Sequence, residues 1–122
     1  VVSGHGSSDE NEKRADGNWE SEDKIYLLSA HEVYEAGTSN QVSSRDTAWD
    51  KTRQLDYYAN LGVTTSNYSG AIKKNNSSNS LWWLRAAISN NNSSFLSVSN
   101  SGDWNSDIAS ANRGFAPAFR IG

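Results

Sequence analysis

The apolar residues of this chain occur in short groups separated by polar stretches, and the spacing within each group predicts an element. Residues 24–28 (KIYLL) are strand-like in composition, which predicts a short strand. Ser29 and Glu32 then fit a capping box, in which each side chain bonds the other residue's backbone N–H at a helix start. A short helix is therefore predicted to run through Tyr34 and to stop at Gly37.

A second helix is predicted from about Ser44 or Asp46 onward. Its apolar residues recur at three- and four-residue steps and would form one face, namely Trp49, Thr52, Leu55, Tyr58 and Ala59. Gly62 would end this helix, because glycine adopts the left-handed conformation of a helix end without strain. Loops are expected over residues 38–43 and 73–80, and an irregular segment over 63–70, because turn-forming and polar residues dominate there.

The last third of the chain is rich in Asn and Ser, which supply 20 of the 48 residues from Asn75 to Gly122. Such a composition fits either low-complexity disorder or a β-rich segment with polar loops. The apolar groups favour the second, because residues 80–87, 95–98 and 115–121 have strand composition. Pro117 lacks an N–H donor and should stand at a sheet edge, at a bulge or on the non-bonded side of its strand.

Length and composition indicate one domain whose core is built from a few large side chains. Of the 122 residues only 35% are hydrophobic, but they include five Trp, five Tyr and three Phe. Residues 1–22 are polar and charged and are predicted to be a linker or mobile segment, and residues 23–122 the domain. The chain opens on Val1 without an initiator Met, so we expect a processed chain or a fragment, preceded by an additional N-terminal domain or chain.

Charge and cysteine usage argue against several classes of function. The net charge is -3 and basic residues are scattered, which disfavours a nucleic-acid partner. No apolar run approaches the roughly 18 residues that span a bilayer, so no membrane insertion is expected. The absence of Cys excludes disulfides and thiolate metal sites. His5 and His31 lack partners spaced for a triad or a zinc site and are expected to be ordinary surface residues.

Three motifs in the chain resemble a bacterial and phage domain family of unknown function. They are the strand–helix opening at residues 23–29, the WWLR segment at residues 82–85 and the GFAPAF segment at residues 114–119. In that family the opening precedes WWLR, and the domain ends in a strand of the form G-[VF]-x-P-A-[FL]. The resemblance covers roughly residues 23–122. Members of the family usually also carry an N-terminal β-rich portion, which we do not find in this sequence.

Members of this family often look like the variable proteins of diversity-generating retroelements, and that resemblance implies both a fold and a function. The implied fold is α+β and C-type-lectin-like, with two helices packed on a small, mainly antiparallel sheet and long polar loops. In such systems reverse transcription corrupts adenines, so that Asn codons become Ser, Asp, Gly, Tyr or His codons. The Asn, Ser and Asp excess over residues 88–113 fits a variable region of this kind.

The implied function is a ligand-binding module that displays a diversified surface on a phage particle, a virion or a cell exterior. It would bind a protein or glycan on a target surface, without a cofactor. Its aromatic frame would be buried and consist of Trp82, Trp83, Leu84, Phe95, Val98, Phe115, Phe119 and Ile121. Residues 88–94, 97, 99–101, 103–107 and 109–113 would point outward, where substitutions cost within about 0.5 kcal/mol.

Short polar side chains around exposed aromatics are also typical of an antibody binding surface. The candidate ligand-binding residues are Ser89, Asn90, Asn91, Asn92, Ser94, Ser99, Asn100, Ser101, Asp103, Trp104, Asn105, Asp107, Ser110, Asn112 and Arg113. The alternative is that residues 88–113 are solvated loops of a structural domain. Trp104 either packs within its own loop as an anchor or contacts a partner. Tyr57 and Tyr68 are weaker candidates for a partner contact.

Two sets of charged residues have spacings or neighbours that suggest special sites. Asp103, Asn105 and Asp107 have the spacing that opens an EF-hand calcium loop, but Gly114 stands where the closing Glu belongs, so a surface turn is favoured and no metal is predicted. Arg85 could pair with Asp103, Asp107 or the chain terminus, and an inward structural salt bridge is favoured over ligand contact.

Two other functions stay open. A structural or assembly domain would use its aromatic surface for oligomerisation. A carboxylate-dependent hydrolase would need a defined pair among Asp50, Asp56, Asp103 and Asp107, which the sequence does not place together, so no enzyme is predicted.

Overall fold

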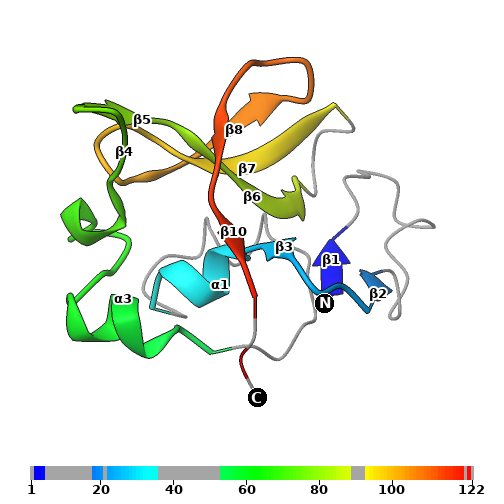
Figure 1. Cartoon of the computed structure of the whole chain (residues 1–122), viewed down its shortest axis with the longest axis horizontal. Helices are drawn as coiled ribbons and strands as arrows, with labels where there is room; N and C mark the ends of the chain where they lie inside the picture. Colours follow the sequence, from blue (N-terminus) through cyan, green and yellow to red (C-terminus); the bar gives the residue numbers. More distant parts are fainter. Residues whose placement is uncertain are drawn as a thin grey trace.

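The structure is a computed structural model that describes residues 2–4, 18–20, 22–35, 53–88, 93–119 and 121. Within these residues the fold is α+β, as predicted, with two short helices, α1 (Ala30–Val33) and α3 (Asp56–Asn60), and one 3-10 turn, η1 (Ser69–Ala71). The helices lie on one side of a larger sheet (Figure 1). No helix among the described residues is long and apolar enough to cross a bilayer.

The larger sheet has four strands in the order β8-β7-β6-β9. They are β6 (Trp82–Ala87), β7 (Ser94–Val98), β8 (Trp104–Ile108) and β9 (Gly114–Phe115). The pairs β6–β7 and β7–β8 are antiparallel, whereas β9 runs parallel to β6. The sequence predicted β6 and β7 but not β8, whose residues were expected to form a loop. A polar strand at the edge of a sheet lacks the apolar pattern that identifies a strand in a sequence.

Three antiparallel pairs complete the described fold. They join β1 (Val2–Gly4) to β2 (Asn18–Glu20), β3 (Tyr26–Leu27) to β10 (Pro117–Ala118), and β4 (Lys73–Asn75) to β5 (Ser78–Ser80). β1 and β2 fall within residues 1–22, which were predicted to be a linker, and β1 lies beside β6. The β4–β5 hairpin corrects the predicted loop over residues 73–80, with Asn76 in the left-handed conformation at its turn.

The capping box at the first helix is confirmed. The Glu32 N–H donates to Ser29 Oγ at 3.2 Å, and the Ser29 N–H donates to Glu32 Oε2 at 2.9 Å. The helix ends at Val33, and Tyr34 is its extended C-cap, so the helix predicted to run through Tyr34 and to stop at Gly37 was too long. Gly37, the predicted stop, lies outside the described residues.

The second predicted helix is confirmed in part. Its described portion begins only at Asp56, because the Gln54 side chain donates to the carbonyls of Val33 and Val63 and holds the chain extended at Leu55. Tyr58 is buried, but Leu55 and Ala59 are exposed, so the predicted apolar face is wrong at these two positions. Residues 44–52 lie outside the described residues. Gly62 ends the helix as predicted, with a φ of +67°.

The C-terminal strand predicted over residues 115–121 is divided in two. β9 pairs with β6 through Trp82 and Trp83, and after Ala116 the chain moves to pair with β3 as β10. Pro117 is the first residue of β10, which is a position that tolerates a missing donor.

The core lies between one face of the larger sheet and the helices. Its sheet residues include Trp82, Leu84, Leu96 and Val98, which contact Val33, Tyr34, Tyr58 and Val63 from the helical side. Two long-range hydrogen bonds fix this packing: Trp82 Nε1 donates to the Ala71 carbonyl at 3.1 Å, and the Tyr34 hydroxyl donates to the Gly102 carbonyl at 2.5 Å. A small set of large side chains therefore carries the core, as the composition indicated.

Burial of the predicted aromatic frame is confirmed for three of its members and wrong for four. Trp82, Leu84 and Val98 are buried and Trp83 is half-buried. The four exposed members are Phe95 (38% exposed), Phe115 (72%), Phe119 (66%) and Ile121 (91%). The error follows from the alternation of side chains between the two faces of a strand. The residues that face the core are the neighbours of the exposed ones, namely Leu96 in β7, Ala116 just before β10 and Ala118 within β10.

Candidate functional site

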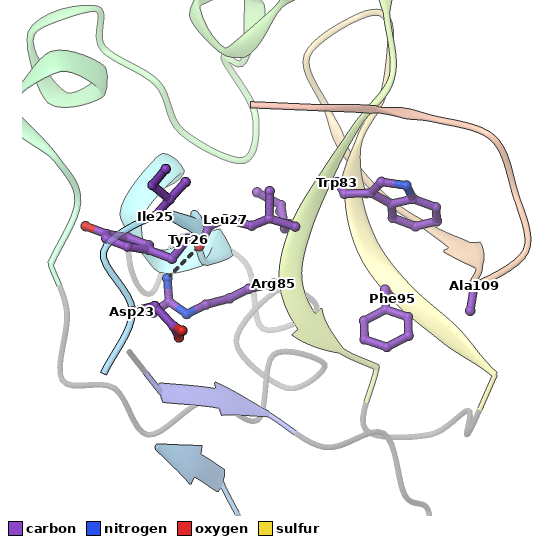
Figure 2. Close-up of a pocket in the computed structure, with 9 residues that line it drawn as sticks. Asp23, Ile25, Tyr26, Leu27, Trp83, Arg85, Phe95 and Ala109 are labelled. Atoms are coloured by element: carbon purple, nitrogen blue, oxygen red, sulfur yellow. Dashed lines mark hydrogen bonds between the residues drawn. The ribbon is translucent and has the colours of Figure 1, made fainter. Parts of the chain in front are cut away.

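A pocket of about 380 Å³ opens where β6 passes the segment leading into β3. Its lining residues come from four separate parts of the chain and are Asp23, Ile25, Tyr26, Leu27, Trp83, Leu84, Arg85, Phe95 and Ala109. Figure 2 shows two sides: Asp23 and Arg85 lie on one, and Trp83, Phe95 and Ala109 on the other. The volume falls within the range of about 300–1,000 Å³ that is typical of small-ligand sites.

The polar side of the pocket is built on a buried ion pair. Arg85 Nη1 donates to Glu32 Oε2 at 2.6 Å, and the two side chains are only 6% and 4% exposed. The same nitrogen donates to the Leu27 carbonyl at 3.3 Å, the bond drawn in Figure 2. The predicted inward salt bridge of Arg85 is therefore confirmed, but its partner is Glu32 and not Asp103, Asp107 or the chain terminus. Glu32 was missed as a partner because it was already assigned to the capping box.

The apolar side of the pocket presents aromatic rings to solvent. Trp83 projects from β6 and is half-buried, whereas Phe95 projects from β7 and is 38% exposed. Both belong to the face of the sheet opposite to the one that carries Trp82, Leu84 and Leu96 into the core. Sequence analysis had placed both rings in the buried frame, and so did not propose them as ligand contacts.

Five of the predicted ligand-binding residues are exposed and polar, and they lie along the edge strand β8 and its two flanking turns. They are Asn100, Ser101, Asn105, Ser110 and Asn112, called here the β8 surface. Ala109, which lines the pocket, adjoins Ser110, so the pocket and the β8 surface are neighbours. Ser89, Asn90, Asn91 and Asn92 lie outside the described residues.

Other members of the predicted surface are buried or occupied. Ser94 is buried, as are Ile88 and Ser97, so their expected outward orientation is wrong. Ile88 directly follows β6 and its N–H donates to the carbonyl of Ser94, the first residue of β7, whereas Ser97 lies within β7 between β6 and β8. Asp107 is half-buried and accepts a 2.8 Å bond from Nε of Arg113, so these two predicted residues pair with each other.

Around the β7–β8 turn the polar groups support the fold. Ser99 Oγ and Ser101 Oγ are 2.8 Å apart within the turn. Trp104 is half-buried and packs against the core, which favours its role as an anchor over a landing point for a partner. Tyr68 also packs against the core, whereas Tyr57 is exposed.

Burial also affects the charge of Asp103. Desolvation raises the pKa of this carboxyl, and a hydrogen bond from the Trp104 backbone partly opposes that effect. Asp103 precedes β8, and Asn105 and Asp107 lie within the strand, which corrects the predicted turn over these residues. No cluster of three or more metal-binding His, Asp or Glu side chains occurs within the ranges that the structure describes.

His31 differs from the ordinary surface residue that was expected. It is half-buried in α1, and its Nε2 has no hydrogen-bond partner among the described residues. His5 lies outside the described residues.

A family model described as "Domain of unknown function (DUF6273)" matches residues 6–122. The chain belongs to this family. The match starts before residue 23, the predicted beginning of the domain, and it takes in the residues of β2. Comparison with curated proteins and with solved structures gave no significant match.

Most of the pocket was missed in the sequence. Asp23, Ile25 and Tyr26 were noted only as the start of a strand, and Ala109 only as part of the variable region. Their one sequence signal is that a short apolar run begins at Ile25, separated by one residue from the acidic pair Glu22 and Asp23. That signal does not indicate which strand will face the run across the pocket.

Proposed function

We propose that this DUF6273 domain is a ligand-binding module that recognises a protein or glycan partner through the pocket and the neighbouring β8 surface. The observation that carries the proposal is the pocket itself, where Trp83 and Phe95 are accessible beside charged groups at a site that the core does not need. Open aromatic rings beside a few convergent polar groups are typical of binding sites.

The β8 surface supports the same proposal. Its five side chains project from an edge strand and two turns, while the core lies behind β6 and β7. Because the core and the surface use different residues, the surface can change without a change in packing. This separation fits a C-type-lectin-like module with a diversified face, displayed on a virion or cell exterior. We favour a binding role over a hydrolase because two of the four carboxylates that a hydrolase could use, Asp56 and Asp107, are held in ion pairs with arginines.

Binding assays on the intact chain test the proposal. A glycan array and a display library of extracellular proteins would be screened with the parent chain and with a variant carrying Asn105→Ala, Ser110→Ala and Asn112→Ala. We expect a partner that the parent binds and that this variant binds at least about 10-fold more weakly, since interface contacts of this kind contribute about 1.4 kcal/mol or more together. A matched triple variant, Ser66→Ala, Asn67→Ala and Asn79→Ala, alters exposed polar residues elsewhere and should bind normally.

Equal weakening by both triple variants would refute the assignment of the β8 surface. Diversification is tested separately by sequencing the surrounding locus. A reverse-transcriptase gene and a near-copy of the region coding for residues 88–113, differing at adenines, are expected.

Assembly is the second candidate function. Phe115, Phe119 and Ile121 are all more than half exposed, and Ile25 projects from the segment next to β10. Exposed apolar residues that form a patch can mark a surface of association between proteins. Sedimentation over a hundredfold range of concentration distinguishes the two functions, because self-association through these residues would raise the mass and Phe119→Ser would reverse the increase.

A further inference from the structure

We infer that the pocket binds an organic cation, meaning an ammonium or alkylammonium group carried on an apolar or aromatic body. This inference rests on the proposed function and names the chemical class of its ligand. It follows from the charges and the ring faces that line the pocket.

The charges in the lining and directly behind it disfavour an anionic ligand. Arg85 is the cation among them, but its guanidinium is buried and bonded to Glu32 at 2.6 Å, so its charge is balanced within the fold. An anionic ligand would have to compete with Glu32 for the same group. Asp23 adds a carboxylate at the exposed rim, on the same side as Arg85 (Figure 2), so these two lining residues and the buried Glu32 together sum to one negative charge.

The aromatic side of the pocket supplies the second element. The faces of Trp and Phe rings carry negative potential and attract cations within about 6 Å of the ring centre. This chain already uses such contacts in its interior, where Lys73 Nζ lies 5.2 Å from the Trp82 ring centre and 5.6 Å from that of Tyr58. In the pocket, Trp83 and Phe95 are accessible and stand across from Asp23 (Figure 2).

The remaining lining residues define the body of the ligand. Ile25, Leu27 and Leu84 are apolar and cannot bond hydroxyl groups. The side chains of the lining that can form hydrogen bonds are Asp23, Tyr26, Trp83 and Arg85, and Arg85 is already bonded to Glu32 and to the Leu27 carbonyl. An apolar body with one positive charge would contact the apolar side chains and the ring faces, and would place its charge near the rim carboxylate.

Calorimetric titration with benzyltrimethylammonium tests the inference, with 3-phenylpropionate and 3-phenylpropanol as anionic and neutral controls. We expect the cation to bind at least about 10-fold more tightly than either control. Trp83→Leu, Phe95→Leu and Asp23→Asn should each weaken it by about 2- to 30-fold, the range that a cation–π or charge contact of about 0.5–2 kcal/mol gives. Phe95→Leu and Asp23→Asn change exposed residues, so the test stands even if Trp83→Leu does not fold.

Two matched variants show whether the effect belongs to the pocket. Glu22→Gln removes an exposed carboxylate next to Asp23, and Phe115→Leu removes an exposed ring, but neither residue lines the pocket. Both should bind the cation as the parent does. Equal binding of the three probes, or equal weakening by Glu22→Gln and Asp23→Asn, would overturn the inference.

A second probe identifies the source of the cation. A blocked Gly-Lys-Gly tripeptide carries a lysine side chain, whereas benzyltrimethylammonium represents a free small molecule. Tighter binding of the tripeptide assigns the pocket to a protein partner, and tighter binding of the free cation assigns it to a metabolite. If neither cation binds but the screens above identify a partner, the inference fails and the proposed function stands; if a cation binds and the screens find nothing, the β8 surface is the part that fails.

Discussion

At the scale of single residues, Glu32 links the first helix to the central strand β6. Its Oε2 accepts the Ser29 N–H at 2.9 Å and Nη1 of Arg85 at 2.6 Å, so one carboxylate oxygen begins a helix and balances a buried cation on β6. The backbone N–H of Arg85 in turn donates to the Leu28 carbonyl. The start of α1, the end of β3 and the wall of the pocket are thus held at one point.

Replacing Glu32 by Gln is expected to lower the free energy of unfolding by about 3–5 kcal/mol, because a full negative charge is withdrawn from a buried guanidinium. Gln still serves a capping box, so the loss reports the charge and not the helix start. Urea denaturation followed by tryptophan fluorescence measures it. Asp56→Asn breaks an ion pair whose side chains are 77% and 76% exposed and should have a far smaller effect. A similar loss in both variants would contradict this account of Glu32.

At the scale of elements, the turn between β7 and β8 depends on a backbone position that only glycine fills well. Gly102 has a φ of +94°, and a Cβ there would stand 2.1 Å from the Tyr68 carbonyl oxygen. Its own carbonyl accepts the Tyr34 hydroxyl. The edge strand that carries the β8 surface is therefore positioned by close backbone contact with the helical side of the domain.

Gly102→Ala is expected to destabilise the domain by about 3 kcal/mol or more, since backbone strain of about 1–3 kcal/mol adds to a steric clash. Gly62→Ala is the matched control: its φ is +67°, but the nearest atom to a new Cβ is Asn67 Nδ2 at 4.0 Å. Strain alone should then cost about 1 kcal/mol. Thermal unfolding of both variants separates strain from clash, and equal losses would mean that the turn adjusts without cost.

Elements were predicted correctly where their cause is local, or where apolar residues mark a strand, as in β6 and β7. The capping box of Ser29 and Glu32 and the helix end at Gly62 need only neighbours in the chain. By contrast, β8 and the β4–β5 hairpin are polar and become strands through pairing that the sequence pattern does not display. The division at Ala116 likewise depends on the two different partners, β6 and β3, that receive the two halves.

At the scale of the whole molecule, parts of the candidate site formed by residues close in sequence were predictable, and parts that join distant segments were not. The β8 surface consists of polar residues close together in sequence, and all five were predicted to point outward and are exposed. The pocket instead joins Asp23, Trp83, Phe95 and Ala109, which only the folded chain brings together. Strand alternation, which cannot be assigned from two aromatic neighbours alone, decided that Trp82 is buried and Trp83 lines the pocket.

Three ionisable side chains in or beside the core, Tyr34, Tyr58 and Lys73, have shifted pKa values. Burial, and secondarily the charge of Asp103, raises the pKa of Tyr34 well above its usual value. Burial raises the pKa of Tyr58 to about 12, with a smaller contribution from Tyr57. Desolvation lowers the pKa of Lys73, whose ammonium lies between the rings of Tyr58 and Trp82.

These shifts predict loss of stability at alkaline pH. A tyrosine with a raised pKa contributes stability that is complete below the unfolded-state pKa near 10 and is lost as pH rises toward the folded-state value, at up to about 1.4 kcal/mol per pH unit for each group. Lys73 acts oppositely, because the unfolded chain holds a proton that the folded chain has released. With two tyrosines against one lysine, unfolding free energy should fall as pH rises above about 10.

Urea unfolding at intervals from pH 8 to pH 11 measures this slope, and Tyr34→Phe identifies its source. The variant keeps the ring but loses the hydroxyl and its bond to the Gly102 carbonyl, so at pH 8 it should be about 1 kcal/mol less stable. Above pH 10 the unfolding free energy of the variant should fall less steeply than that of the parent, because one buried phenol no longer titrates. The two slopes should differ by up to about 1.4 kcal/mol per pH unit. Parallel pH profiles would show that Tyr34 ionises as readily in the folded chain as in the unfolded one, which its burial and its contact with Gly102 argue against.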